Sequence, residues 1–275
     1  MSNQVTTIIT TDKVVANNEL RLSICLQSNG FSFSIITLDD TLMTFGEADF
    51  EFNLPFDQLV SSIKGFIVDN GLPTFGCKDV KLIAPSEHFV WIPEHLYEPL
   101  RDWQYIKTVS SFDNPKLSLF HAYSDTLKSY MVFSAPSDVA MAFKVAIPGI
   151  DIVNQHSILA NKMLLNRSLQ HPVLLMHVRN RVGDFDAFYN NQLLLSNSYA
   201  ASNDDELLYH ALDVMKKLHL ETPDMELAIC GLVGRDIYCR LQHYFPNVTL
   251  YTGRPLNYEN SQFQTFHTYR HALLL

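Results

Sequence analysis

The chain has 275 residues, enough for one large domain or two ordinary ones, and 47% of them are hydrophobic against 18% charged. This composition is typical of a well-buried globular protein and excludes a disordered chain. The net charge of −9 and the absence of any run of five Lys or Arg residues argue against a nucleic-acid-binding surface, because phosphate contacts need clustered cations.

Targeting signals are also missing from the sequence. The opening MSNQVTTIITTDK has neither a charged n-region nor an apolar h-region, and no apolar stretch approaches the ~18 residues of a membrane span. The four cysteines are dispersed without a C-x-x-C pair, which favours reduced thiols. We therefore expect a cytoplasmic protein without a membrane span.

The first part of the chain alternates strand and helix patterns. Asn29-Gly30 is a strong hairpin turn between two strands, and Asp39-Asp40 form the next turn. Gly71 is a plausible C-cap and Ser137 a plausible N-cap. The strands are expected at 21–28, 31–38, 41–46, 79–85, 88–93, 116–123, 129–136 and 150–153, and the helices at 55–71, 94–103 (broken near Pro99), 137–147 and 156–169.

The second part repeats the beginning of the first. Strands are expected at 173–179, 184–189, 192–197, 225–231 and 248–251, and helices at 204–218 and 234–245. The order of three strands, a helix and a strand in 21–85 thus returns in 173–231, with Asn190-Asn191 at the place of Asp39-Asp40. The spacing of roughly 150 residues is too long for a solenoid and predicts two similar α/β lobes. The last residues, FHTYRHALLL, predict a short buried edge element.

Three stretches resemble the actin-like ATPase superfamily, in particular its bacterial pilus-assembly and cell-division members. Residues 131–165 look like the end of a first lobe in that superfamily. Residues 178–199 look like the opening of a second lobe, and residues 229–251 look like the segment that carries the adenosine loop. The chain is also similar to an uncharacterised bacterial family with an actin-like ATPase fold. The resemblance implies an α/β fold of two ribonuclease H-like lobes, residues 1–170 and 171–275, with an interlobe cleft.

The sequence departs from this superfamily where its chemistry resides. In the ATPases both lobes open with a strand carrying D-x-G, whereas here these strands read SICLQSNG and MHVRNRVG, and the first acid, Asp184, follows the turn. The adenosine loop reads Gly231-Leu232-Val233-Gly234, with Leu232 in place of one of the usual paired glycines. The resemblance therefore implies that the fold persists without the phosphate chemistry.

Four residues are candidates for holding an anion or a nucleotide in the cleft. Arg179 and Arg181 lie in the turn of the second hairpin and could hold an anion by charge-assisted hydrogen bonds, although a solvated turn is the alternative. Gly231 and Gly234 permit close approach of the backbone before a helix N-terminus.

Asp184 and Asp186 share one face of a strand and are the alternative candidates for metal binding or acid–base work. His267 and His271, four residues apart, lack a third ligand at informative spacing. The leading hypothesis has no catalytic residue, metal or cofactor: a non-catalytic, degenerate actin-like protein that acts as a cytoplasmic scaffold or binds an unknown protein partner. The alternative is a nucleotide-binding ATPase or small-molecule kinase with metal-binding acids relocated to Asp184 or Asp186.

Overall fold

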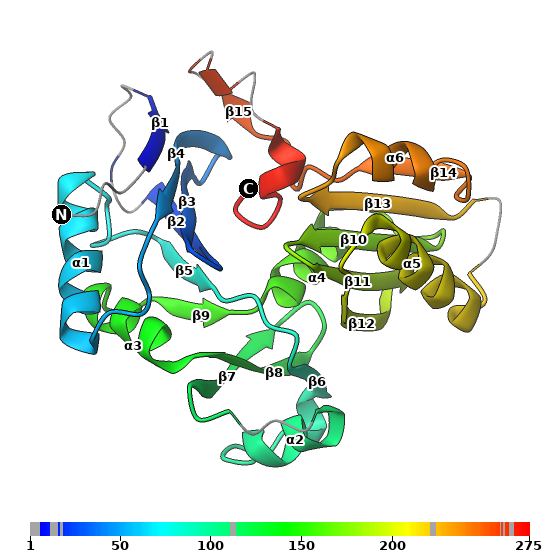
Figure 1. Ribbon diagram of the computed structural model, residues 1–275, viewed down its shortest axis with the longest axis horizontal. Helices are drawn as coiled ribbons and strands as arrows, with labels where there is room; N and C mark the ends of the chain where they lie inside the picture. The colour runs from blue at the N-terminus through cyan, green and yellow to red at the C-terminus, as the bar shows by residue number, and fades with distance from the viewer. Residues whose placement is uncertain are drawn as a thin grey trace.

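Two large β-sheets lie side by side in the computed structural model, and a small third sheet lies below them in the view of Figure 1. The structure describes residues 6–11, 16, 19–110, 114–220, 224–258, 260, 262–263 and 267–275. The first sheet has the order β1-β4-β3-β2-β5-β9, with β15 paired to β4. Its strands are β1 (Thr6–Thr10), β2 (Leu20–Gln27), β3 (Gly30–Thr37), β4 (Thr41–Asp49), β5 (Asp79–Ile83), β9 (Asp151–Val153) and β15 (Asn257–Tyr258).

The second sheet has the order β12-β11-β10-β13-β14 and the third the order β6-β8-β7. The strands of the second sheet are β10 (Val173–Arg179), β11 (Val182–Tyr189), β12 (Gln192–Ala200), β13 (Glu226–Gly231) and β14 (Asn247–Leu250). Those of the third are β6 (Phe89–Pro93), β7 (Leu117–Ser124) and β8 (Ser129–Pro136).

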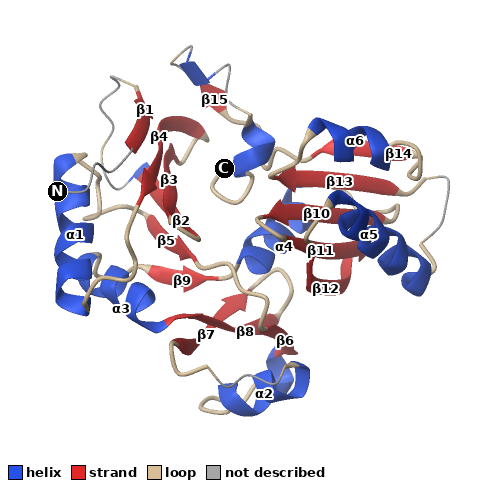
Figure 2. Cartoon of the chain, in the orientation of Figure 1, coloured by secondary structure: helices blue, strands red, loops and turns tan. Residues whose placement is uncertain are grey.

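Helices cover the outer sides of the two large sheets and also lie between them (Figure 2). They are α1 (Phe56–Asp69), α2 (Asp102–Val109), α3 (Ser137–Ala146), α4 (Gln155–Asn166), α5 (Asp204–Leu218) and α6 (Arg235–Leu241), with short 3-10 turns at Glu94–Leu96 and Thr268–His271. The predicted α/β class is confirmed. In the described part of the chain, no helix has the length and apolar character that crossing a bilayer requires.

The predicted internal repeat is confirmed by the topology of the two sheets. The path β4-β3-β2-β5-β9 has the same order as β12-β11-β10-β13-β14, an antiparallel meander followed by two parallel strands. Asp39-Asp40 join β3 to β4, and Asn190-Asn191 join β11 to β12. The division of the chain at residue 170 stays a prediction, and β15, late in the chain, pairs with β4 of the first sheet.

Two local predictions hold in their main point. The hairpin predicted at Asn29-Gly30 is present, but its turn residues are Ser28 and Asn29, and Gly30 is the first residue of β3, paired with Gln27. A Cβ at Gly30 would lie 2.0 Å from the Ala48 carbonyl oxygen, so only glycine fits there. Gly71 follows α1 with a φ of +59°, the left-handed conformation that ends many helices.

Two other local predictions differ from the structure. The break predicted near Pro99 is present, but the segment 94–103 consists of a 3-10 turn that ends at Leu96, a stretch in which Leu100 has a φ of +70°, and only the first two residues of α2, which starts at Asp102. The proline at position 99 explains the break, since the residue before a proline avoids the helical region. Ser137 is the first residue of α3 rather than its cap, and its hydroxyl shares a 2.8 Å hydrogen bond with that of Ser118.

The apolar residues form three clusters, and the middle one lies between the lobes. The outer clusters pack the first sheet against α1 and α3 and the second sheet against α5 and α6. The middle cluster combines the inner faces of both sheets with α4, and it includes Leu273, Leu274 and Leu275 from the end of the chain. Figure 1 shows this end between the two sheets. The predicted edge element is therefore buried, but in the centre of the molecule.

Candidate functional site

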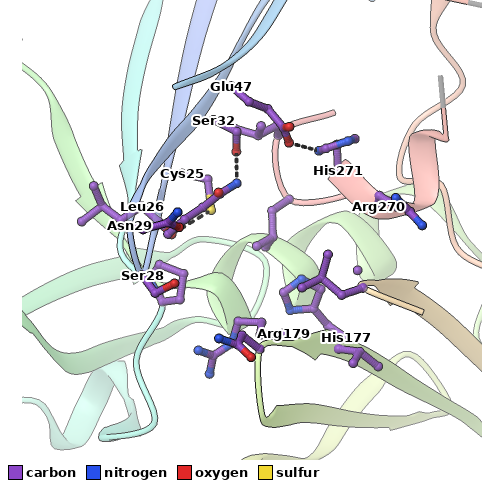
Figure 3. Close-up of a pocket in the computed structure, with 18 of the residues that line it drawn as sticks. Cys25, Leu26, Ser28, Asn29, Ser32, Glu47, His177, Arg179, Arg270 and His271 are labelled. Carbon is purple, nitrogen blue, oxygen red and sulfur yellow. Dashed lines mark hydrogen bonds and ion pairs between the residues drawn. The ribbon is translucent and has the colours of Figure 1, made fainter. Parts of the chain in front are cut away.

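A cavity of about 730 Å³ lies between the two lobes (Figure 3). One wall is Cys25 to Asn29, the end of β2 and its turn into β3. The opposite wall is His177 to Asn180, the equivalent end of β10, together with Gly231 and Leu232. The structure thus brings together the two strand ends at which the resemblance places phosphate chemistry. Residues from the end of the chain, including Arg270 and His271, form a further wall.

Two of the four predicted anion-binding residues line this cavity. Arg179 and Gly231 contribute to its wall, whereas Arg181, with a φ of +58° in the β10–β11 turn, and Gly234, the N-cap of α6, are not among the lining residues. Gly231 has a φ of +86°, and a Cβ there would lie 2.2 Å from the carbonyl oxygen of Val178. Its glycine character is therefore explained by the tight contact between β13 and β10.

The cavity wall carries more positive than negative groups. Arg179 and Arg270 line it, and Glu47 is the one acid among the described lining residues. Burial raises the pKa of Glu47. Burial, together with the nearby Arg270, lowers the pKa of His271 to about 4, so this imidazole is neutral, and its ring packs against Phe45 at 4.5 Å between centroids.

Asp184, one of the two alternative metal ligands, is fully buried and surrounded by donors. The Arg179 guanidinium binds it through Nε at 2.7 Å and Nη2 at 2.8 Å. Its other donors are His177 Nδ1 at 2.9 Å, Ser198 Oγ at 2.6 Å and Gln155 Nε2 at 3.2 Å. Burial alone would raise the pKa of Asp184, but Arg179, His156 (Nε2 at 3.6 Å) and His177 together hold it well below its usual range. The carboxylate is thus fully engaged inside the protein.

Asp186, the second alternative ligand, pairs with a histidine that sequence reasoning missed. His156 Nδ1 lies 2.8 Å from Asp186 Oδ1, and its Nε2 lies 2.9 Å from Ser198 Oγ. Burial alone would lower the pKa of His156, but the carboxylates of Asp186 and Asp184 raise it to about 9. The imidazolium therefore donates from both nitrogens at neutral pH.

Asp186, His156 and Ser198 are hydrogen-bonded in the order of an acid–histidine–serine catalytic triad. The protonation state of the histidine and the direction of the serine hydrogen bond do not suit such a triad. A general base must be neutral to accept the serine proton. Here the histidine is cationic and the Ser198 hydroxyl donates to Asp184. We use the name central network for the buried hydrogen-bonded group of Gln155, His156, His177, Arg179, Asp184, Asp186 and Ser198.

The central network also connects the two lobes. Gln155 Nε2 donates to the carbonyl oxygen of Ser86 at 2.9 Å, and Gln155 Oε1 accepts from the Ser86 N–H at 3.0 Å. Ser86 follows β5 of the first sheet, while Asp184 lies on β11 of the second. Within the described ranges, no group of three or more His, Cys, Asp and Glu side chains is arranged to hold a metal.

Comparison with known proteins places this geometry in a fold family. A family model described as "Protein of unknown function (DUF3822)" matches residues 10–248. The crystal structure of a Bacteroides thetaiotaomicron protein with an actin-like ATPase fold and unknown function is similar with a TM-score of 0.73 at 20% identity, covering 86% of this chain and 91% of the other. A structure of the PilM-PilN type IV pilus biogenesis complex gives 0.52 at 10% identity, covering 94% and 96%. No curated protein matches the sequence. The predicted actin-like ATPase fold is confirmed.

Proposed function

The chain belongs to the DUF3822 family of unknown function. From that premise we propose that it is a non-catalytic protein with an actin-like ATPase fold, and that it acts in the cytoplasm by binding a protein partner. One observation carries the proposal. The strand ends at the interlobe cavity present Cys25 and Gln27 from one lobe and His177 and Arg179 from the other. None of these is a good ligand for Mg²⁺, which prefers carboxylate oxygens.

The nearest carboxylates do not substitute for the missing ones. Asp184 accepts hydrogen bonds from four side chains, including both Nε and Nη2 of Arg179. Asp186 is paired with His156, away from the cavity lining. Hydrolysis of a nucleotide needs a metal held against the phosphates and a positioned water, and the ends of β2 and β10 supply no acid for either role. Glu47, the one acid among the described lining residues, lies on β4 and not at these strand ends, with its Oε1 3.8 Å from His271 Nδ1.

Partner binding is supported by analogy as well as by the loss of these acids. The PilM-PilN structure is a complex in a pilus biogenesis system, and PilM shares the general fold of this chain. We propose a protein partner rather than nucleic acid, because the chain carries a net charge of −9 without a cationic run.

A second candidate function is weak anion or nucleotide binding without a metal. The observation that favours it is the cavity wall, where Arg179 and Arg270 face a single acid, Glu47, among the described lining residues. Arg179 is already paired with Asp184, so its charge is largely neutralised. Any such binding would involve Arg179 and Gly231 most directly, with Arg181 and Gly234 further from the cavity lining.

Thermal unfolding tests the proposal. We expect Tm in the presence of millimolar ATP and Mg²⁺ to equal Tm with ATP alone, because the ends of β2 and β10 present no acid that could hold the metal. A ligand at 100 times its Kd would add about 2.7 kcal/mol of stability and raise Tm by several degrees. Sulfate serves as the control for simple anion binding. A rise in Tm that requires both ATP and Mg²⁺ would contradict the proposal and favour the ATPase or kinase alternative.

A further inference from the structure

The segment Ala272–Leu275 is buried between the lobes without belonging to any strand. Leu273 and Leu275 expose only 7% and 3% of their surface. Within the described residues, the main-chain N–H groups of Leu274 and Leu275 bond only to the carbonyl oxygen of His271, inside the same turn. The segment is therefore held in place by other parts of the chain through its carbonyl oxygens and its side chains.

All four carbonyl oxygens of the segment accept hydrogen bonds from side chains. Lys162 Nζ, on α4, donates to the oxygens of Ala272 at 2.8 Å, Leu273 at 3.0 Å and Leu275 at 3.0 Å. Ser34 Oγ, on β3, donates to the oxygen of Leu274 at 2.9 Å. The protonated form of Lys162 has three donors, and the segment accepts from all of them. In the recognition of extended peptides, hydrogen bonds to the main chain supply affinity and pockets for side chains supply specificity.

The site occupied by the segment, formed by Lys162, Ser34 and the surrounding apolar side chains and called its seat below, is continuous with the interlobe cavity. Leu273 and Leu274 line that cavity on one side and belong to the middle apolar cluster on the other. The same cluster contains Cys25 of β2 and Cys230 of β13, one from each lobe and both buried. Cys25 already lines the cavity, whereas Cys230 does not. Departure of the segment would therefore enlarge the cavity and bring water to Cys230.

We infer that the space between the lobes is a peptide-binding site, and that residues 272–275 are its exchangeable ligand in this chain, seated on Lys162 and Ser34. The segment bridges α4 and β3 with main-chain contacts and packs its leucines against both sheets. It connects the two lobes from within the chain. Its position on the cavity wall makes it the part whose release would open the cavity.

The test uses the full chain with a protease recognition sequence inserted between Phe263 and His267, in a Cys77→Ser, Cys239→Ser background that leaves only the two buried thiols. After folding and cleavage, we expect the fragment with residues 267–275 to stay bound through gel filtration and to exchange with a fluorescent synthetic peptide of the same sequence. Excess unlabelled peptide should displace the fluorescent one. A retained fragment that never exchanges would overturn the inference, because it would then be a permanent part of the core.

A lysine variant identifies the seat. Lys162→Met should weaken peptide retention at least about tenfold and raise the labelling rate of Cys230 by a similar factor, since the three hydrogen bonds that Lys162 donates are lost. Lys216→Met, at the exposed end of α5, is the matched substitution and should change neither the retention of the peptide nor the labelling rate.

Val214→Ala, in the outer core of the second lobe, controls for general destabilisation and should lower Tm while keeping the Cys230 thiol protected. Equal retention in the Lys162→Met and Lys216→Met proteins would overturn the assignment of the seat. Should Lys162→Met fail to fold, peptide exchange on the cleaved wild-type sequence decides the question.

Discussion

Replacement of Asp184 by asparagine is expected to lower the free energy of unfolding by about 3 to 5 kcal/mol. The carboxylate is fully buried and is the common acceptor of Arg179, His177, Ser198 and Gln155. Asparagine keeps the shape but removes the charge, so the Arg179 guanidinium and the His156 imidazolium lose their shared counter-ion inside the protein. Such a loss is a large fraction of the 5 to 15 kcal/mol that typically stabilises a domain.

Urea unfolding followed by circular dichroism measures this effect. Asp125→Asn is the matched control, because Asp125 pairs with Lys128 in solvent with 86% of its side chain exposed. That substitution should cost no more than about 1 kcal/mol. If the two variants lost equal stability, the central network would contribute nothing special, and its role in joining the lobes would be wrong.

His156→Gln is expected to change the pH dependence of stability by ~3 kcal/mol. The carboxylates of Asp186 and Asp184 outweigh burial and raise the pKa of His156 to about 9 in the folded protein, against about 6.5 in the unfolded chain. A group with a raised folded pKa contributes stability that is complete below the unfolded value and is lost as pH rises through the folded one. The advantage of the wild type over the variant should therefore be largest at pH 6 and should shrink between about pH 6.5 and 9.

The difference between the two proteins isolates this contribution. Burial, with Arg254 and Lys81 nearby, lowers the pKa of Lys162 to about 7, which makes stability rise with pH above that value, opposite in sign to the effect of His156. Because Lys162 is present in both proteins, its contribution cancels. Free energies of unfolding from urea titrations at intervals from pH 6 to 9 give the result. A wild-type advantage that stays constant over this range would show that His156 is not held as a cation.

The sheets could be predicted from the sequence because their signals are local. Asn29-Gly30 and Asn190-Asn191 mark the turns of two meanders, and alternating or continuous apolar runs mark their strands. Strands β1 and β15 were not predicted, since each is short and depends on pairing with β4, which is distant from β15 in the sequence.

The candidate site could be predicted only in part. An interlobe cleft was expected, and the ends of β2 and β10 line one cavity between the lobes. Asp184 and Asp186 were expected on one strand, but their partner His156 comes from α4, and no spacing in the sequence joins a helix to a strand about thirty residues later. The seat of residues 272–275 was missed for the same reason, because Lys162 and Ser34 are brought to it only by the folded arrangement of both lobes.

Phosphate release from ATP is the measurement that tests the central claim most directly. With purified protein, Mg²⁺ and millimolar ATP, we predict a rate of phosphate release equal to that of a buffer blank. Loss of a single group that acts in the transition state typically lowers the rate about a hundredfold or more, and the acids expected at the ends of β2 and β10 are both missing here. Steady phosphate release that co-purifies with the protein and disappears in a folded Asp186→Asn variant would contradict it, and would place the protein among the ATPases or kinases instead.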